Sequence, residues 1–202
     1  MKNKICHITT VHNAKDTRIF QKECVSLANH GFDTHLIVAN QKSETSKGVQ
    51  IHNITSTTSG RLYRMWKTTQ IALEKALKID ADIYHFHDPE LLPVGIKLKK
   101  FGKKVIYDTH EDVPRQILSK YYIPSLIRPF VATIFEIYEN RIAAKMDAVI
   151  TATPFIRDRF LKINTRTIDI NNYPILEKFN IEISNEKTHD ICYVGLISKI
   201  RG

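Results

Sequence analysis

The chain has 202 residues, 43% of them hydrophobic, and a net charge of +9 at pH 7. This is the composition of a globular protein and excludes an intrinsically disordered chain. No apolar run has the length of a signal-peptide core or approaches the roughly 20 residues of a membrane span. We therefore expect a soluble, cytoplasmic protein whose positive charge favours anionic partners.

Strand-like and helix-like segments then alternate along the chain. Short apolar runs predict strands at 4–10, 33–39, 48–54, 81–87, 103–109, 147–153 and 166–171. Helices are predicted at 18–30, where Gly31 stops the helix, and at 61–79, 89–101, 124–146 and 154–163. In the second helix, apolar residues recur at helical spacing at Leu62, Trp66, Ile71, Leu73 and Leu77. This order predicts an α/β fold with a Rossmann-like, mostly parallel sheet flanked by helices.

The end of the chain departs from this alternation. Residues 172–188 are polar, contain Pro174 and show no clear period, so we interpret them as an interdomain linker. Residues 189–202 begin like a new buried strand and stop there. We therefore expect one domain at 1–171, the linker at 172–188, and the first strand and loop of a truncated second domain at 189–202.

Cysteine usage and the clustered lysines exclude further classes. Cys6, Cys24 and Cys192 lie far apart without a CxxC pair, which argues against a disulfide framework and a zinc ribbon. The densest basic stretch, KLKKFGKK at 97–104, lies where a helix should end, and the helix dipole favours cations there. Nothing further indicates nucleic-acid binding, so we expect none.

Polar side chains gather at the predicted strand ends. In an open parallel sheet, ligands bind beyond the carboxyl ends of the strands, where the strand order reverses. The first and fourth strands should flank this point. We expect the following residues to share one groove there: His12, Asp16, Arg18, His87 and Asp88, with His110 and Glu111 one strand further on.

The stretch HFHDPE at 85–90 has more than one interpretation. Asp88 followed by proline is a strong helix start and explains Asp88 structurally, while the alternative places it in the groove. In a strand, His85 and His87 point to the same side. We interpret His85 as a core histidine and His87 as facing the groove. An HxH pair can hold zinc, but Asp88 follows at once, unlike the HxHxDH pattern, so we expect no metal site.

The first strand–helix turn, TTVHNAKDTRIF, contains no glycine. A Rossmann dinucleotide site needs glycines there so that the backbone can approach the pyrophosphate. We therefore expect side chains to bind the ligand at this turn. Arg18 suits a phosphate or a carboxylate, and the alternative is a surface residue paired with Asp16 or Glu23.

Four stretches in order carry a resemblance: DTRIFQKECVSLANHGFDTHLIV, DIYHFHDPELLPVG, KVIYDTHEDVP and ICYVGLISKIRG. Together they resemble the amino-terminal half of family 4 glycosyltransferases, which are retaining enzymes with the GT-B fold. The resemblance covers nearly the whole chain. It implies two Rossmann-like domains facing each other across a cleft, with the acceptor on the amino-terminal domain and the nucleotide sugar on the other. The nucleotide sugar is a co-substrate, and no cofactor is implied.

The resemblance also implies roles for particular residues. His110, at the end of KVIYDTH, would reach the sugar at the reaction centre and is the catalytic candidate. His85, His87 and Asp88 map to the acceptor side, so the acceptor-binding candidates are His12, Asp16, Arg18, His87, Asp88 and Glu111. In VGLISKIRG, Gly195, Arg201 and Gly202 match the element that binds the donor diphosphate, while Leu196 replaces an arginine of the family.

The expected function is the acceptor domain of a hexosyltransferase-type enzyme that builds surface polysaccharide on a glycan or lipid-linked acceptor. We expect the fragment alone to be inactive because the catalytic centre lies between two domains. One alternative is a metal-dependent hydrolase that uses His85, His87 and His110. The other is a non-enzymatic module that binds anions.

A last segment, 119–145, bears on membrane contact. Its apolar residues fall near one helical face, and a core-facing amphipathic helix is the first interpretation. These residues are Ile123, Ile127, Phe130, Ile134, Tyr138 and Ile142. The alternative is an interfacial patch of Lys120, Tyr121, Tyr122 and Arg128 that touches anionic lipid at the inner face of the membrane.

Overall fold

A computed structural model describes residues 2–55 and 61–175. The predicted donor-diphosphate residues Gly195, Arg201 and Gly202 lie outside the described residues, as does most of the predicted linker. Its described part, 172–175, has no regular secondary structure. In the described ranges, no helix combines the length and apolar character needed to cross a bilayer.

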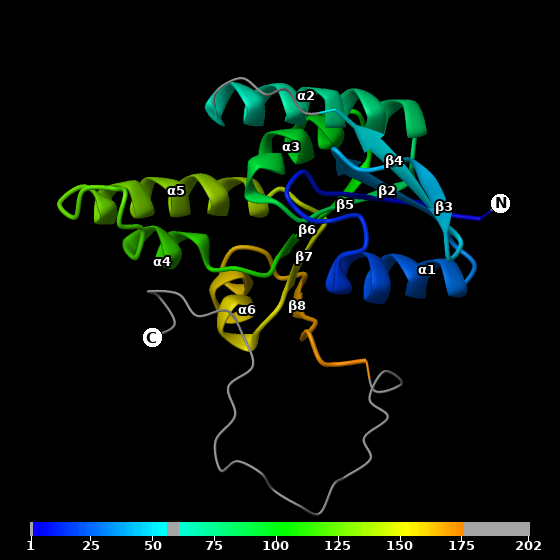
Figure 1. Cartoon of the computed structure of the whole chain (residues 1–202). Coiled ribbons are helices and arrows are strands. Elements are labelled where there is room, and N and C mark those ends of the chain that lie inside the picture. The colour runs from blue at the N-terminus through cyan, green and yellow to red at the C-terminus, as the bar shows by residue number, and fades with distance from the viewer. Residues whose placement is uncertain (1, 56–60, 176–202) are drawn as a thin grey trace, which may run out of the picture.

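The described chain forms an eight-stranded sheet in the order β3-β4-β2-β1-β5-β6-β7-β8 (Figure 1). The strands are β1 (Lys4–Ile8), β2 (Asp33–Ala39), β3 (Glu44–Ser46), β4 (Val49–Ile54), β5 (Ile83–Phe86), β6 (Lys104–Thr109), β7 (Ala148–Thr151) and β8 (Thr167–Asp169). All neighbouring pairs are parallel except β3 with β4. The predicted α/β class with a mostly parallel sheet is therefore confirmed, and the order reverses between β1 and β5, as predicted.

Helical segments connect these strands. They are η1 (Thr17–Cys24), α1 (Val25–Asn29), α2 (Arg61–Ile79), η2 (Pro89–Leu91), α3 (Leu92–Lys100), α4 (Val113–Leu118), α5 (Arg128–Ala143) and α6 (Pro154–Leu161). The sequence analysis missed β3 and α4, and it extended the helix at 124–146 beyond both ends of α5. The first predicted helix begins as a π-helix, in which the Gln21 N–H donates to the Asp16 carbonyl five residues back.

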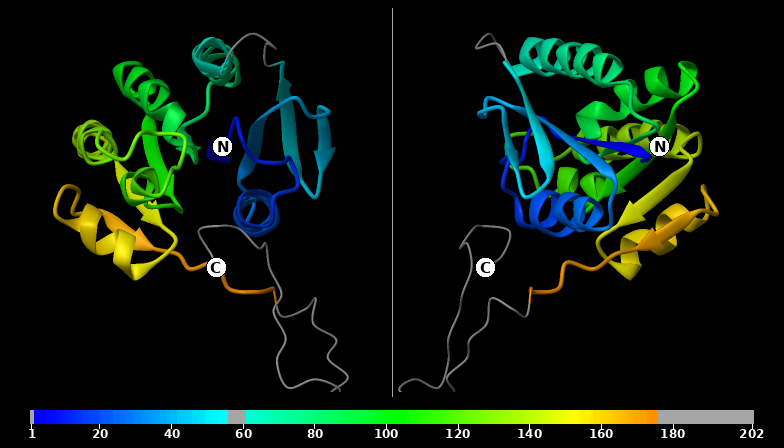
Figure 2. Two further views of the ribbon diagram at one scale, coloured as in Figure 1. Left: turned by 60° about the vertical axis from the view of Figure 1, so that its left-hand side comes forward. Right: turned by 90° about the vertical axis from the view of Figure 1, so that its right-hand side faces the viewer.

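The helices divide the sheet into two unlike faces. We call the face that packs against α2, α3, α5 and α6 the apolar face; η1 and α1 pack on the other, the η1 face. In Figures 1 and 2, α2 and the η1–α1 segment lie on opposite sides of the sheet. The apolar face has a continuous core, in which Phe86 of β5 stacks on Tyr107 of β6 and Phe160 of α6 meets the edge of that ring.

The apolar cluster of the η1 face lies where η1 and α1 cover β2 and β4. There Ile19 and Phe20 of η1 pack on Leu36 and Val38 of β2. Towards the carboxyl ends of β1, β5 and β6 this face is instead polar, because His7, His85, His87 and Asp108 occupy the alternating positions that point towards η1. All four are buried. Since buried charges are costly unless paired, this strip needs partners, and η1 supplies them.

Candidate functional site

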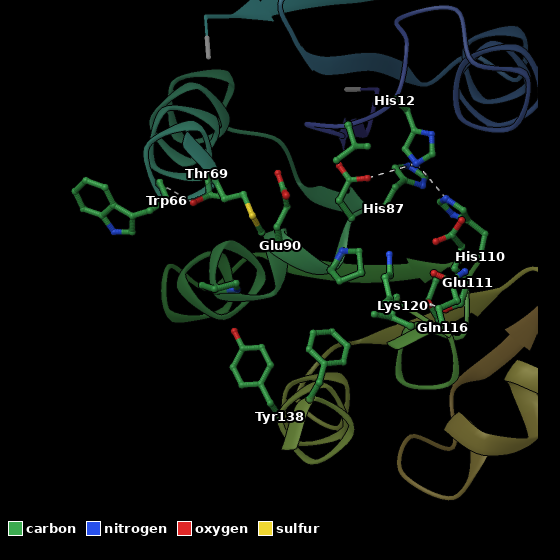
Figure 3. Close-up of a pocket in the computed structure, with 18 of the residues that line it drawn as sticks. His12, Trp66, Thr69, His87, Glu90, His110, Glu111, Gln116, Lys120 and Tyr138 are labelled. Atoms are coloured by element: carbon green, nitrogen blue, oxygen red, sulfur yellow. Dashed lines mark hydrogen bonds and ion pairs between the residues drawn. The ribbon is translucent and has the colours of Figure 1, made fainter. Parts of the chain in front are cut away.

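A pocket of about 590 Å³ opens beyond the carboxyl ends of β1, β5 and β6. Its walls come from the loop after β1, the first half of α2, the start of η2 and α3, the loop after β6, α4 and α5 (Figure 3). The residues that line it include His12, Trp66, His87, Asp88, Glu90, His110, Glu111, Gln116, Lys120 and Tyr138. This is the edge of the sheet at which the sequence predicted a ligand groove.

Two histidines from distant strand ends meet at this pocket. His12 Nε2 lies 3.1 Å from His110 Nε2 and 3.5 Å from Asp88 Oδ1. Its Nδ1 lies 3.8 Å from Asp16 Oδ2. Burial lowers the pKa of His110 below the ordinary value; Asp108 opposes this shift, and the neighbouring His12 adds to it. The imidazole of His110 is therefore held neutral near pH 7, as a group that accepts or passes a proton must be.

Asp88 fixes the loop that carries His12. Its Oδ2 accepts hydrogen bonds from Thr9 Oγ1 at 2.9 Å and from Thr10 N and Oγ1 at 2.5 and 3.1 Å. Asp88 does occupy the N-cap position of η2, but its side chain makes no capping bond. The predicted helix start at Asp88 and Pro89 is therefore found, but the carboxylate does not act as its cap. The carboxylate instead ties the end of β1 to the end of β5 and so shapes the pocket.

Asp16 and Arg18 do not line the pocket. Asp16 caps η1, since its Oδ1 accepts from the N–H groups of Arg18 and Ile19 at 2.8 and 2.9 Å. Arg18 is buried and turned beneath the sheet, where its Nη2 donates to both Asp108 oxygens at 3.0 and 3.1 Å. Its Nε lies 3.2 Å from Glu23 Oε1. Of the alternatives left open for Arg18, pairing with Glu23 is found, but in the interior and not on the surface.

His87 belongs to both the pocket floor and the buried strip. Its side chain is inaccessible, with Nε2 3.0 Å from His7 Nδ1 and Nδ1 3.4 Å from Asp108 Oδ2. Burial lowers the pKa of His87 to about 4. Burial alone would raise the pKa of Asp108, but hydrogen bonding towards His85 and His87 holds it well below its ordinary value. The neutral imidazole of His87 thus lies beside an ionised carboxylate, and His85 is the buried histidine the sequence predicted.

The described residues contain two groups of potential metal ligands. One is formed by His7, Glu23, His85 and His87, and the other by His87, Asp108 and His110. The hydrolase alternative required His85, His87 and His110 in one site. The two groups instead separate His85 from His110.

Sequence reasoning missed the aromatic side of the pocket. Trp66 was placed on an apolar stripe and Tyr138 on a core-facing one, but they are 59% and 41% exposed. Figure 3 shows them at one end of the pocket, with His12 and His110 at the other. The alternation of apolar residues along a helix reveals a stripe but not whether another element covers it, so no signal in the sequence separated these two from core residues.

The mostly parallel α/β sheet with a pocket at its carboxyl edge is the fold of a GT-B glycosyltransferase domain. Residues 17–170 match the family described as Glycosyltransferase Family 4, and the chain therefore belongs to that family. This match favours a transferase over the hydrolase and anion-binding alternatives. No curated protein matches the chain in sequence.

Solved structures share this fold at low identity. Sucrose-phosphate synthase from Thermosynechococcus elongatus superposes with a TM-score of 0.65 at 15% identity, covering 87% of this chain and 49% of that one. A glycosyltransferase from Rickettsia africae ESF-5 superposes with a TM-score of 0.53 at 16% identity, covering 84% of this chain and 43% of that one. An E. coli structure described as "Trehalose-6-phosphate" bound with UDP-2-fluoro glucose superposes with a TM-score of 0.54 at 11% identity, covering 80% of this chain and 42% of that one. The chain thus spans about half the length of these proteins.

Proposed function

We propose that this chain is the acceptor-binding domain of a retaining glycosyltransferase, which moves a hexose from a nucleotide-sugar donor to a glycan or lipid-linked acceptor. The family match and the structural neighbour that holds a UDP-sugar analogue support a nucleotide-sugar donor. No cofactor is needed besides that co-substrate. We further propose a cytoplasmic location and a role in surface polysaccharide synthesis.

The observation that carries the proposal is the convergence of His12, Asp88 and His110 at one end of an open pocket. Three carboxylates, those of Asp88, Glu90 and Glu111, line the same pocket and can accept hydrogen bonds from acceptor hydroxyls. Trp66 and Tyr138 offer apolar surfaces to a sugar ring at the other end. The neutral His110, in contact with His12, is placed to hydrogen-bond the reacting sugar.

Glycosyl transfer leaves negative charge on the departing diphosphate, which needs cations or helix termini. The family resemblance implies that role for Gly195, Arg201 and Gly202, which lie beyond the described part of the chain. We therefore expect the 202-residue chain to bind acceptor but to lack transfer activity without a donor-binding domain. Glu111 is then an acceptor ligand and not half of a glycosidase carboxylate pair.

The test of catalysis uses an enzyme in which this chain is joined to a donor-binding domain. His110→Ala should lower the rate of nucleoside diphosphate release by roughly 10²–10⁴-fold, the range for a lost acid–base group. His30→Ala is the matched control, because His30 is exposed at the end of α1 and hydrogen-bonds only locally, to the Ser26 carbonyl. Unchanged turnover of a folded His110→Ala enzyme removes His110 from the mechanism.

The test of acceptor binding needs only this chain. Trp66 is its single tryptophan and lies at the pocket, so its fluorescence reports occupancy directly. Oligosaccharides and lipid-linked saccharides should change the emission in a saturable way, and Glu111→Gln together with Gln116→Ala should weaken the response. A signal that no saccharide changes would count against an acceptor pocket here.

We also propose that α5 and the segment before it contact a membrane surface peripherally. Tyr121, Leu126, Phe130 and Ile134 are 83%, 93%, 67% and 51% exposed. The core-facing interpretation of 119–145 is therefore wrong for Phe130 and Ile134. Lys120 lies over the Tyr122 ring at 5.8 Å. Exposed aromatic and aliphatic side chains beside cations are typical of interfacial segments on anionic lipid.

Vesicle flotation tests this contact. The chain should float with vesicles containing phosphatidylglycerol, less so in high salt, and Leu126→Ser with Phe130→Ser should abolish flotation. Phe155→Ser is the control, because Phe155 is 72% exposed but lies on α6. Absence of binding to anionic vesicles removes the membrane proposal and leaves the transferase proposal intact.

A further inference from the structure

Four potential metal ligands from three elements converge at the centre of the η1 face. His7 comes from β1, His85 from β5, His87 from the end of β5, and Glu23 from η1. Each offers one ligand atom, and these atoms all lie within 4.8 Å of one another. Because β1 and β5 are adjacent parallel strands with His7 opposite His85, the three imidazoles are neighbours on the same side of the sheet.

This cluster is buried but poorly satisfied. The side chains of His7 and His87 are inaccessible and that of Glu23 is 14% exposed. Nevertheless neither Glu23 carboxylate oxygen has a hydrogen-bond partner. Oε1 lies 3.2 Å from Arg18 Nε, whereas Oε2 faces His7 and His87. A bound ion is one standard explanation for a buried polar atom without a hydrogen bond.

The distances suit a small divalent cation. His7 Nδ1 lies 3.0 Å from His87 Nε2, and each lies 3.7 Å from Glu23 Oε2. An ion at the centre of this triangle is about 2.0 Å from all three atoms, which matches the typical zinc–nitrogen and zinc–oxygen bond lengths. His85 stands beside His7, with ring centroids 4.4 Å apart, and can close the coordination from one side.

The surroundings also suit a metal-bound histidine. Asp108 Oδ2 lies 3.4 Å from His87 Nδ1. The carboxylate can therefore accept a hydrogen bond from this ring nitrogen, which faces away from the ion. Arg18 is the nearby cation; it pairs with Asp108 and with Glu23 Oε1, which leaves Glu23 Oε2 to face the ion.

We propose that His7, His85, His87 and Glu23 form a structural Zn²⁺ site that fastens η1 to the centre of the sheet, below the floor of the acceptor pocket. Three imidazoles and one carboxylate are a donor set that zinc favours. Burial of the ligands indicates a structural role and not a catalytic one. The proposal departs from the sequence expectation of no metal, and it does not depend on the proposed function.

A second histidine pair provides an internal contrast. His35 and His52 stack on the other face with Nδ1 to Nε2 at 2.9 Å, almost the spacing of His7 and His87. That pair is not part of either group of potential metal ligands in the described residues. The competing explanation for both pairs is a hydrogen bond that needs no metal, and the experiment must separate the two.

The experiment measures metal binding by the 202-residue chain. Protein purified without chelator should contain one zinc per chain by elemental analysis, and the chelated protein should regain one Co²⁺ with the visible absorption of a tetrahedral site. Glu23→Gln, which keeps the side-chain shape, should lower zinc affinity by at least about tenfold. His52→Gln should leave both stoichiometry and affinity unchanged.

Each result decides the proposal. Zinc should also raise the unfolding temperature of the wild-type chain but not that of Glu23→Gln, a readout that holds even if a histidine variant fails to fold. A chain that neither retains zinc nor takes up Co²⁺ overturns the site. The site is also overturned if His110→Gln weakens zinc binding while Glu23→Gln does not, because the ion would then lie in the pocket.

Discussion

The two faces of the sheet reach stability by different means. The apolar face is covered by α2, α3, α5 and α6 around a continuous core of aliphatic and aromatic side chains. On the η1 face, the apolar contacts of η1 and α1 stop at β2 and β4, and the centre is held by Arg18, Asp108, Glu23 and histidines. Each methylene removed from an apolar core lowers the unfolding free energy by a limited amount. Removing one partner from a buried ionic cluster leaves the remaining charge uncompensated and costs more. The η1 face should therefore be the more sensitive to single polar changes.

The largest effect is expected at the centre of the η1 face. Asp108→Asn removes one of the two carboxylates that Arg18 pairs with in the interior. Breaking a buried ion pair typically costs about 3–5 kcal/mol of unfolding free energy, and we expect the lower end of that range because Glu23 stays beside Arg18. Urea unfolding with chelator present, to exclude bound metal, measures this cost. Asp158→Asn is the control, because Asp158 pairs with Arg157 at the surface, where such pairs contribute about 0–1 kcal/mol. Equal effects of the two substitutions would contradict the comparison.

A second carboxylate at the same edge of the sheet sharpens the contrast, because its partners are uncharged. Asp88→Ala leaves the Thr9 hydroxyl and the Thr10 N–H without their acceptor, while the Thr10 hydroxyl still donates to Glu90. We expect a loss of about 2–3 kcal/mol, since each buried donor left unpaired costs about 1–3 kcal/mol. Urea unfolding measures the loss, and Trp66 fluorescence with saccharide should show weaker binding as the loop loses its anchor. Full stability with normal binding would show that the loop needs no such anchor.

Single polar changes should lower the unfolding free energy less on the apolar face than on the η1 face. An enlarged side chain in the apolar core should lower it more. A Cβ at Gly95 of α3 would lie 2.7 Å from Phe86 Cε1 and 3.3 Å from Met146 Sδ. Overpacking of this kind costs about 1–3 kcal/mol, while alanine regains up to about 1 kcal/mol of helix propensity over glycine. Gly95→Ala should therefore lower the unfolding free energy by about 1–2 kcal/mol. A stabilised Gly95→Ala variant would mean that the Phe86 ring shifts without cost.

Particular residues show why the sequence predicted the strand ends better than the faces. Parallel strands bring their carboxyl ends to one edge whatever covers them, so His12, Asp88 and His110 were correctly predicted to converge. Which way a helical side chain turns depends on its neighbours in three dimensions. Arg18 turns beneath the sheet to reach Asp108, from which it is separated by 90 residues, and no local pattern encodes that pairing.

The same limit explains the missed elements. The edge strand β3 is three residues, ETS, whose polar side chains give no apolar alternation, and it exists because it pairs with β4. Tyr138 and Phe130 follow the helical period, yet they are exposed because no element of the described chain covers that side of α5. Periodicity predicts an apolar stripe, and tertiary contacts decide whether it is core.

The smallest change in stability is expected at the His35–His52 pair, which lies on the apolar face and not in the buried cluster of the η1 face. Burial, and then the charge of Lys75, lowers the pKa of His52 to about 4 from an ordinary value of 6.5. The folded state therefore binds fewer protons than the unfolded chain between these values, so the stabilisation from neutral His52 is complete above pH 6.5 and is lost as the pH falls towards 4. His52→Gln should flatten the decline in urea midpoint between pH 6.5 and 4, while other titrating groups contribute equally to both proteins. Parallel curves for the two proteins would show that His52 titrates normally in the fold.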